Sequence, residues 1–441
     1  MSVAGVGGAA AGASPVVIPP GVVPAAVYRR AVWRILPLMF ILYIASFLDR
    51  VNLNHAEVPF SHDLGLDKAQ YGFGAGLFFI GYLLSQVPSN MILVRLGPRR
   101  WIACIMVAWG LISGAMAFAT DKYSFYALRM LLGFAEAGFF PGMLLYLSYW
   151  FPSTLRAQMV GRFMTAIAVS QVIGSTLSFQ LMRLDGVAGL HGWQWLFMIE
   201  ALPSILLTLV VLKAMVNQPS EAPWLSRDEA AWLDAELAAD RARVTAVGRR
   251  DLRAAFTEPR VYLLMIVYVA DCLANYGTTF SITSLIQDSG KFTNQHAIIL
   301  TAIPYTAATV AMIVVGWNSD RTRSPRAHVA IPYLVAAAAF LGATTCMTQP
   351  VPFIACATIG IAAVYCALGP FWALPATFLA GPAAAAGIAV INSVGNLGGF
   401  VGTTLKGSFA PVVWFQIAAG VLIVGALVTM ALRLPRQGGE R

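Results

Sequence analysis

The chain has 441 residues, of which 58% are hydrophobic and only 11% are charged. Soluble globular proteins carry about 45–50% apolar and about 25% charged residues, so this composition excludes a water-soluble enzyme and equally a disordered or fibrous chain. The net charge of +9 favours cationic loops on one membrane face over a nucleic-acid partner, because Lys and Arg accumulate in the cytoplasmic loops of membrane proteins.

The amino-terminal segment consists mainly of Ala, Gly, Val and Pro and has no charged residue before position 29. It lacks both the basic start and the continuous apolar core of a signal peptide, so we predict a disordered tail over residues 1–28. Arg29, Arg30 and Arg34 then precede the first long apolar run. Basic residues at this place favour a cytoplasmic amino terminus.

Twelve apolar runs follow, each close to or above the ~20 residues that an α-helix needs to cross a bilayer. They are residues 33–56, 71–94, 101–119, 123–150, 157–181 and 193–215, and then residues 261–287, 296–317, 327–348, 351–379, 383–405 and 410–432. We predict an all-α membrane protein with twelve transmembrane helices. Its parts are an amino-terminal six-helix bundle (29–215), a cytoplasmic linker (216–260), a carboxy-terminal six-helix bundle (261–432) and a cytoplasmic tail (433–441).

The distribution of Lys and Arg supports this layout. If every run crosses the membrane, 22 of the 29 cationic residues fall on the side of the two termini and 5 fall in the opposite loops. The other two, Arg50 and Arg129, lie inside apolar runs. The asymmetry predicts that both termini are cytoplasmic.

The linker is the one sizeable polar segment. Ser226 and Glu229 have the spacing of a capping box, and Trp232, Leu233 and Leu237 follow on one side of the expected helix. We predict a short amphipathic helix along the inner membrane surface. The linker has neither the His and Cys residues nor the Gly-rich loop of a catalytic or nucleotide-binding segment.

The two halves interrupt their apolar runs at corresponding places. Residues 140–142 (Phe-Pro-Gly) break the fourth run and residues 369–370 (Gly-Pro) break the tenth, while glycines punctuate the fifth and the eleventh. Paired interruptions in two six-helix halves are typical of transporters that are built from repeats and bind their substrate near the bilayer midplane. Ordinary helix-packing glycines explain single positions but not the correspondence.

Four charged residues lie inside the apolar runs of the amino-terminal half, where charge is costly and usually functional. Asp49 and Arg50 are adjacent, so their side chains point about 100° apart. Arg129 and Glu136 are seven residues, or two turns, apart and share a helix face. A bound anion would compete with the neighbouring carboxylate for an arginine, so binding of the anion and protonation of that carboxylate would be coupled. Structural ion pairing between the first and fourth helices is the alternative.

Further polar residues are candidates for the wall of a cavity, with hydrogen bonding between helices as an equal alternative. They are Tyr82, Gln171, Trp372, Asn392 and Asn396. Asp271, with Tyr276 just over one turn on, either lines the cavity or contacts a neighbouring helix. His55 lies near the outer end of the first helix, where a solvated rim position is expected. The five cysteines are expected to be buried apolar residues, and no cofactor, metal site or enzyme activity is predicted.

Several motifs together resemble one family. They are FLDRVN (47–52), RMLLGFAEAGFFPG (129–142), WFP (150–152), GPFWALP (369–375) and INSVGNLGG (391–399). The chain is similar in these segments to the anion:cation symporter family of the major facilitator superfamily. The resemblance covers about residues 30–435 and implies the major facilitator fold, location in a bacterial inner membrane, and proton-coupled uptake of organic anions such as galactonate, hexuronates, tartrate, phthalate or hydroxyphenylacetate.

The resemblance also implies roles for individual residues. It makes Asp49 and Glu136 the protonatable pair and Arg50 and Arg129 the arginines associated with substrate. It makes Tyr82 a cavity tyrosine and places Asn392 and Asn396 on a polar face. The chain departs from the family at residues 403–405, where a proline is usual, and at His55 and Asp271, where many members are apolar. These two residues, with Tyr276, are candidates for substrate choice.

The expected function is therefore secondary active transport of a small organic anion together with protons, by a chain that works as a monomer in the bilayer. An exchanger or exporter of similar anions and a sensor that has lost transport are the alternatives. The sequence leaves the anion open, because Trp372, Tyr82 and Tyr276 favour an aromatic carboxylate while Gln171 and the asparagines favour a sugar acid.

Overall fold

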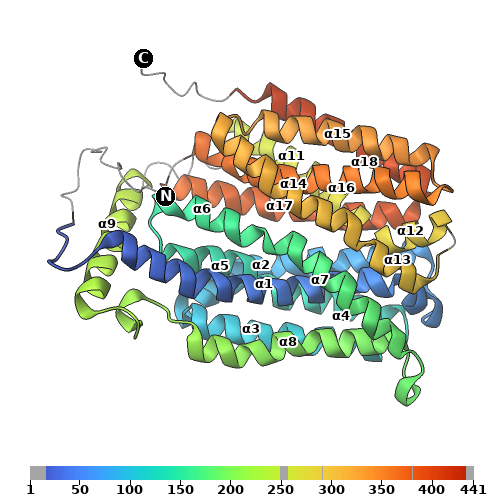
Figure 1. Cartoon of the computed structure of the whole chain (residues 1–441), viewed down its shortest axis with the longest axis horizontal. Helices are drawn as coiled ribbons and strands as arrows, with labels where there is room; N and C mark the ends of the chain where they lie inside the picture. The colour runs from blue at the N-terminus through green and yellow to red at the C-terminus, as the bar shows by residue number, and fades with distance from the viewer. Residues whose placement is uncertain (1–15, 249–256, 291, 380, 434–441) are drawn as a thin grey trace.

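The computed structural model describes residues 16–248, 257–290, 292–379 and 381–433. In these ranges twelve helical segments are long and apolar enough to cross a membrane, and no strand is present. The segments run side by side through the molecule (Figure 1). The predicted all-α fold with twelve spans is confirmed. The expected tails over residues 1–15 and 434–441 lie outside the described residues.

The amino-terminal bundle contains eight helices. They are α1 (Pro24–Asp63), α2 (Lys68–Leu96), α3 (Pro98–Ala115), α4 (Lys122–Glu136), α5 (Phe139–Ser148), α6 (Ser153–Met164), α7 (Ala166–Leu181) and α8 (Gly192–Ala214). The pairs α4–α5 and α6–α7 each form one span. The predicted break in the fourth span falls at residues 137–138, because Pro141 has no N–H to donate and its ring clashes with the carbonyl of the residue four positions before it.

The described residues of the carboxy-terminal bundle form another eight α-helices. They are α11 (Pro259–Thr279), α12 (Ile282–Gly290), α13 (Asn294–Leu300), α14 (Ala302–Thr322), α15 (Ala327–Thr345), α16 (Pro350–Ala373), α17 (Gly381–Ser408) and α18 (Pro411–Ala431). Here the predicted interruption is different, because Pro370 lies inside α16 and the helix continues to Ala373. The two bundles meet mainly where α2 packs on α17 and α7 packs on α13 and α14.

Helix α1 is longer than its predicted apolar run. It begins at Pro24, so residues 24–28 belong to the helix and not to a disordered tail. Proline is favoured in the first turn because its fixed φ suits a helix and its missing N–H would have no partner there. Tyr28 in this extension packs edge-on against Trp232, with 5.7 Å between ring centroids. The contact joins this extension to α9.

Close helix packing inside each bundle depends on glycine. A Cβ added at Gly133 in α4 would lie 1.9 Å from the carbonyl oxygen of Phe78 in α2, and one added at Gly402 in α17 would lie 2.3 Å from that of Leu273 in α11. Both distances are far below van der Waals contact, so only glycine allows these backbones to meet. Small residues have the same role in membrane helix pairs generally.

The linker helix α9 (Arg227–Gly248) lies across one end of the bundle, beside the start of α1 (Figure 1). The predicted capping box is present, since Ser226 Oγ accepts from the Glu229 amide at 3.2 Å and Glu229 Oε2 accepts from the Ser226 amide at 3.0 Å. The Ser226 amide and then Arg30, which forms an ion pair with Glu229, hold the pKa of this carboxyl below its usual value.

The apolar side of α9 faces protein. Trp232, Leu233 and Leu237 are buried, and Asp240 accepts hydrogen bonds from the amide and the hydroxyl of Ser153 at the start of α6. The predicted linker helix is present, and α9 packs on α17 as well as contacting α1 and α6. Its place along the inner membrane surface stays a prediction. We call this end of the molecule the α9 end, and the other the far end.

Candidate functional site

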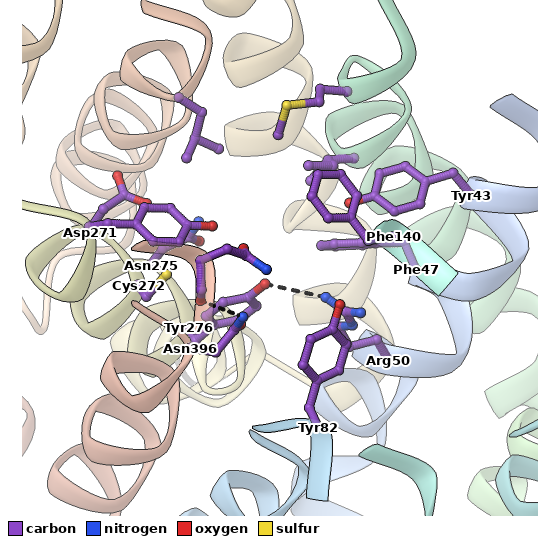
Figure 2. Close-up of a pocket in the computed structure, with 15 residues that line it drawn as sticks. Tyr43, Phe47, Arg50, Tyr82, Phe140, Asp271, Cys272, Asn275, Tyr276 and Asn396 are labelled. Carbon is purple, nitrogen blue, oxygen red and sulfur yellow. Dashed lines mark hydrogen bonds between the residues drawn. The ribbon is translucent and has the colours of Figure 1, made fainter. Parts of the chain in front are cut away.

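A cavity lies between the two bundles near the middle of the spanning helices (Figure 2). It encloses about 50 Å³ and is lined by fifteen residues. The amino-terminal bundle supplies Tyr43, Phe47, Arg50, Tyr82, Phe140, Met164 and Ile167, and the carboxy-terminal bundle supplies Tyr268, Asp271, Cys272, Asn275, Tyr276, Leu368, Asn392 and Asn396. Both bundles therefore contribute to one site.

Helical periodicity explains how α1 lines this cavity. Tyr43, Phe47 and Arg50 follow the spacing i, i+4, i+7 and share one face. Asn392 and Asn396 in α17 have the same i, i+4 relation, and their predicted shared face is the one that meets the cavity. Each helix thus presents a short row of side chains from the middle of its length.

Arg50 and Glu136 form the central polar contact. Arg50 donates to Oε1 of Glu136 from Nη2 at 2.5 Å and from Nε at 3.1 Å, and Ser46 Oγ donates to the same oxygen at 2.7 Å. Glu136 is fully buried, and its Oε2 has no hydrogen-bond partner in the described part of the chain. Arg50 also donates from Nη1 to the hydroxyl of Tyr276 at 3.4 Å (Figure 2). The guanidinium of Arg50 therefore contacts the carboxylate of Glu136 in its own bundle and the hydroxyl of Tyr276 in the other bundle.

Asp49 points away from the cavity. Its carboxylate accepts a hydrogen bond from Ser113 Oγ of α3 at 2.6 Å and another from Ser204 Oγ of α8. The reason is geometric, since consecutive helical residues differ by about 100° in direction and Arg50 occupies the cavity face. Of the predicted protonatable pair, Glu136 adjoins the cavity arginine, and Asp49 lies among helices of the amino-terminal bundle.

Arg129 is also separate from the cavity lining. Its side chain is 1% exposed, and Nη2 donates to the carbonyl of Ala75 at 3.3 Å. The guanidinium lies over the rings of Phe78 and Phe280, at 5.1 and 5.4 Å from their centroids. Phe280 belongs to the other bundle, so Arg129 contributes to the contact between the halves. The four charges expected to act together are thus divided, with Arg50 and Glu136 paired and the others apart.

The remaining predicted residues fall into two groups. Those that line the cavity are Tyr82, Asp271, Tyr276, Asn392 and Asn396. Gln171 and Trp372 lie outside the lining. Gln171 Nε2 is 3.4 Å from the hydroxyl of Tyr365, and Trp372 packs edge-on against Tyr268 with centroids 4.9 Å apart. Trp372 is therefore positioned to support an aromatic residue that does line the cavity.

His55 was expected at a solvated rim, and this expectation is wrong. Its side chain is fully buried, and neither ring nitrogen has a partner in the described part of the chain. The cause is that the two bundles close over it. Asn294 Nδ2 donates to the His55 carbonyl at 3.5 Å, and the Thr283 amide donates to Asn54 Oδ1 at 3.4 Å.

This closure extends across the far end. Ser175 Oγ of α7 and Thr301 Oγ1, at the junction of α13 and α14, are 2.8 Å apart. Tyr71 donates to the carbonyls of Leu53 and Phe280 at 3.1 and 3.2 Å, and so bridges the bundles. In the described residues, most side-chain hydrogen bonds between the two bundles lie at the level of the cavity or between the cavity and the far end. On the α9 side of the cavity, Ser393 Oγ donates a hydrogen bond to Gln86 Oε1 at 2.9 Å.

Sequence reasoning missed most of the aromatic lining. Tyr43, Phe47, Phe140 and Tyr268 all face the cavity but appear in the sequence as ordinary apolar residues of long hydrophobic runs. Helical spacing from Arg50 could have found the first two, since they lie seven and three positions before it. The others needed the packing of the two bundles.

A helical bundle of this kind, with a central cavity closed at one end by its own two halves, defines a membrane transport protein. Residues 39–403 match the Major Facilitator Superfamily, and the chain belongs to that family. It is a transporter and not an enzyme. The motifs predicted a resemblance to the organic-anion transporters of this superfamily, and two relatives of the chain confirm it.

Two relatives and one solved structure illustrate the similarity. A putative tartrate transporter of Agrobacterium vitis is 42% identical over 94% of this chain and 96% of its own length. The putative metabolite transport protein NicT of Pseudomonas putida is 40% identical over 92% and 94%. A bacterial homologue of the human lysosomal transporter Spinster, inward-facing and unoccupied, has a TM-score of 0.71 at 16% identity over 93% and 96% of the chains. The last comparison shows the fold alone.

Proposed function

We propose that the chain carries a small organic anion together with protons by alternating access, in the direction of uptake. The observation that carries the proposal is the Arg50–Glu136 pair beside the cavity. Arg50 offers a planar fork that matches a carboxylate. A substrate carboxylate that takes over these donors leaves Glu136 buried without its cation. An uncompensated buried charge is costly, so binding of the anion and protonation of Glu136 favour each other.

The two bundles supply the alternating access. They are joined across the far end in the described conformation, so movement of a substrate to that side requires these contacts to break. Repeat-built transporters rock one bundle against the other around a fixed central site. The names of the tartrate transporter and NicT support a small metabolite as cargo.

The proposed location is a bacterial inner membrane, with both termini and α9 in the cytoplasm, and the proposed functional unit is the monomer in the bilayer. The excess of Lys and Arg on the side of the termini supports this orientation. A cysteine introduced at Lys122 should react with an impermeant thiol reagent outside intact cells, in a background without native cysteines. A cysteine at Arg241, which is exposed on α9, should not. Reaction at Arg241 in intact cells would contradict the orientation.

Uptake into proteoliposomes tests the function. With an inward proton gradient, a panel of tartrate, sugar acids and aromatic carboxylates should include at least one anion that accumulates about tenfold or more above its external concentration. A protonophore should abolish the accumulation. Arg50→Lys keeps the charge but loses the fork and should raise KM at least tenfold. Exchange of anions without any response to the gradient would indicate an exchanger, and binding without transport would indicate a sensor.

A further inference from the structure

Two charged groups line the cavity from opposite bundles. Arg50 lies on α1, and Asp271 lies across the cavity on α11 (Figure 2). Arg50 is matched by Glu136, but no ion pair of Asp271 occurs in the described residues. Its Oδ1 accepts one hydrogen bond, from the hydroxyl of Tyr333 in α15 at 3.0 Å. The side of the cavity that faces Arg50 therefore carries a carboxylate without a cation.

This carboxylate has acceptor capacity to spare. An ionised carboxylate can accept about four hydrogen bonds, and Tyr333 supplies one. A buried charge is tolerated when donors or a cation satisfy it. A ligand that presented only anionic groups to both walls would bind at Arg50 and be repelled at Asp271. A ligand with a donor at its other end would be held at both.

The body of the cavity is aromatic. Tyr43, Phe47, Tyr82 and Phe140 come from the amino-terminal bundle, and Tyr268 and Tyr276 come from the carboxy-terminal bundle. Aromatic side chains pack favourably on flat rings by offset stacking or edge contacts. Gln171 and Trp372, which favoured opposite substrate classes in the sequence, both lie outside the lining, while Asn275, Asn392 and Asn396 add amide groups to the carboxy-terminal wall. The wall between Arg50 and Asp271 therefore suits a ring that carries polar groups.

We propose that Asp271 is a specificity-determining residue that reads a hydrogen-bond donor on the substrate, and that the substrate is a ring-bearing carboxylate with an O–H or N–H group remote from its carboxylate. The carboxylate binds Arg50 and the donor binds Asp271. Tyr333 is a positioning residue that orients Asp271. This inference rests on the proposed function, because it assumes that Arg50 binds the anion.

Matched ligand pairs test it by calorimetry on the purified, intact protein. The pairs are benzoate with 4-hydroxybenzoate and phenylacetate with 4-hydroxyphenylacetate, which differ only in the hydroxyl and sample two separations between carboxylate and donor. Hydrogen bonds to charged groups correspond to roughly 10- to 100-fold in affinity. In at least one pair the wild type should bind the hydroxylated member at least tenfold more tightly.

The variant Asp271→Asn keeps the shape of the side chain and an oxygen for Tyr333. It should reduce the preference for the hydroxyl to less than threefold, while the affinity for the unhydroxylated acid stays unchanged or rises. Glu200→Gln is the matched control, because Glu200 is a buried carboxylate of α8 that accepts from Ser178 at 2.7 Å and does not line the cavity. It should keep the full preference. Tyr333→Phe is a second variant that leaves the carboxylate in place, and it should lower the preference three- to tenfold.

The outcomes separate the inference from the function. The role of Asp271 would be overturned if the wild type showed no preference for the hydroxylated member of either pair. It would also be overturned if Asp271→Asn lost affinity equally for both members of a pair while Tyr333→Phe kept the wild-type preference. In either case, the proposed function would still be supported if all four acids bind the wild type and bind Arg50→Lys more weakly. Failure of every carboxylate, including tartrate and sugar acids, to bind the wild type would overturn both.

Discussion

Replacement of Glu136 by Gln is expected to abolish accumulation driven by a proton gradient while exchange across the membrane continues. Glutamine mimics the protonated acid, and its amide oxygen can still accept from Ser46 and Arg50, which both donate to Oε1 in the native protein. Without a proton to release, the carrier can exchange substrate for substrate but cannot couple the two gradients. Accumulation should fall from about tenfold or more to the external concentration, with counterflow within about threefold of the wild type.

Proteoliposomes allow both activities to be measured on one preparation. Asp49→Asn is the comparison, because it makes the same chemical change on a buried carboxylate that contacts Ser113 and Ser204 instead of Arg50. We expect Glu136 to separate the two activities more clearly than Asp49. Full gradient-driven accumulation in both variants would contradict the role of these carboxylates as proton carriers. Loss of accumulation and counterflow together in a folded Glu136→Gln protein would favour a structural ion pair.

A disulfide between cysteines at Ser175 and Thr301 is expected to stop transport. The two hydroxyl oxygens are 2.8 Å apart, both side chains are fully buried, and they belong to opposite bundles at the far end. Oxidation of the pair, with the five native cysteines replaced, would fix the bundles in the described arrangement. Uptake should drop by more than 90% and return after reduction.

Two controls make this result specific. Each single cysteine variant should transport with or without oxidant. A pair of Thr176→Cys and Thr301→Cys should not cross-link, because Thr176 is exposed and donates to its own helix at Val172. Uptake at the wild-type rate by fully cross-linked protein would show that the far end need not open.

The number of membrane spans and the candidate charged residues could be predicted from the sequence, because the first depends on the length of apolar runs and the second on the cost of burying a charge. The twelve spans follow from the ~20 apolar residues that a bilayer requires, and a helical segment lies at each of them in the structure. Ser226 and Glu229 predicted the start of α9, because a capping box is a local pattern. Arg50 and Glu136 stood out because a charge in an apolar run is rare.

The direction in which each side chain points was decided by the tertiary structure. Asp49 and Arg50 are neighbours in the chain, yet one contacts α3 and α8 and the other reaches Glu136 and Tyr276. His55 is buried because the second bundle closes over α1. In a bundle surrounded by lipid, the faces of a helix toward lipid, neighbours and cavity are all largely apolar, so hydrophobic periodicity does not distinguish them. The aromatic lining and the place of Asp271 opposite Arg50 therefore depend on how the two bundles pack.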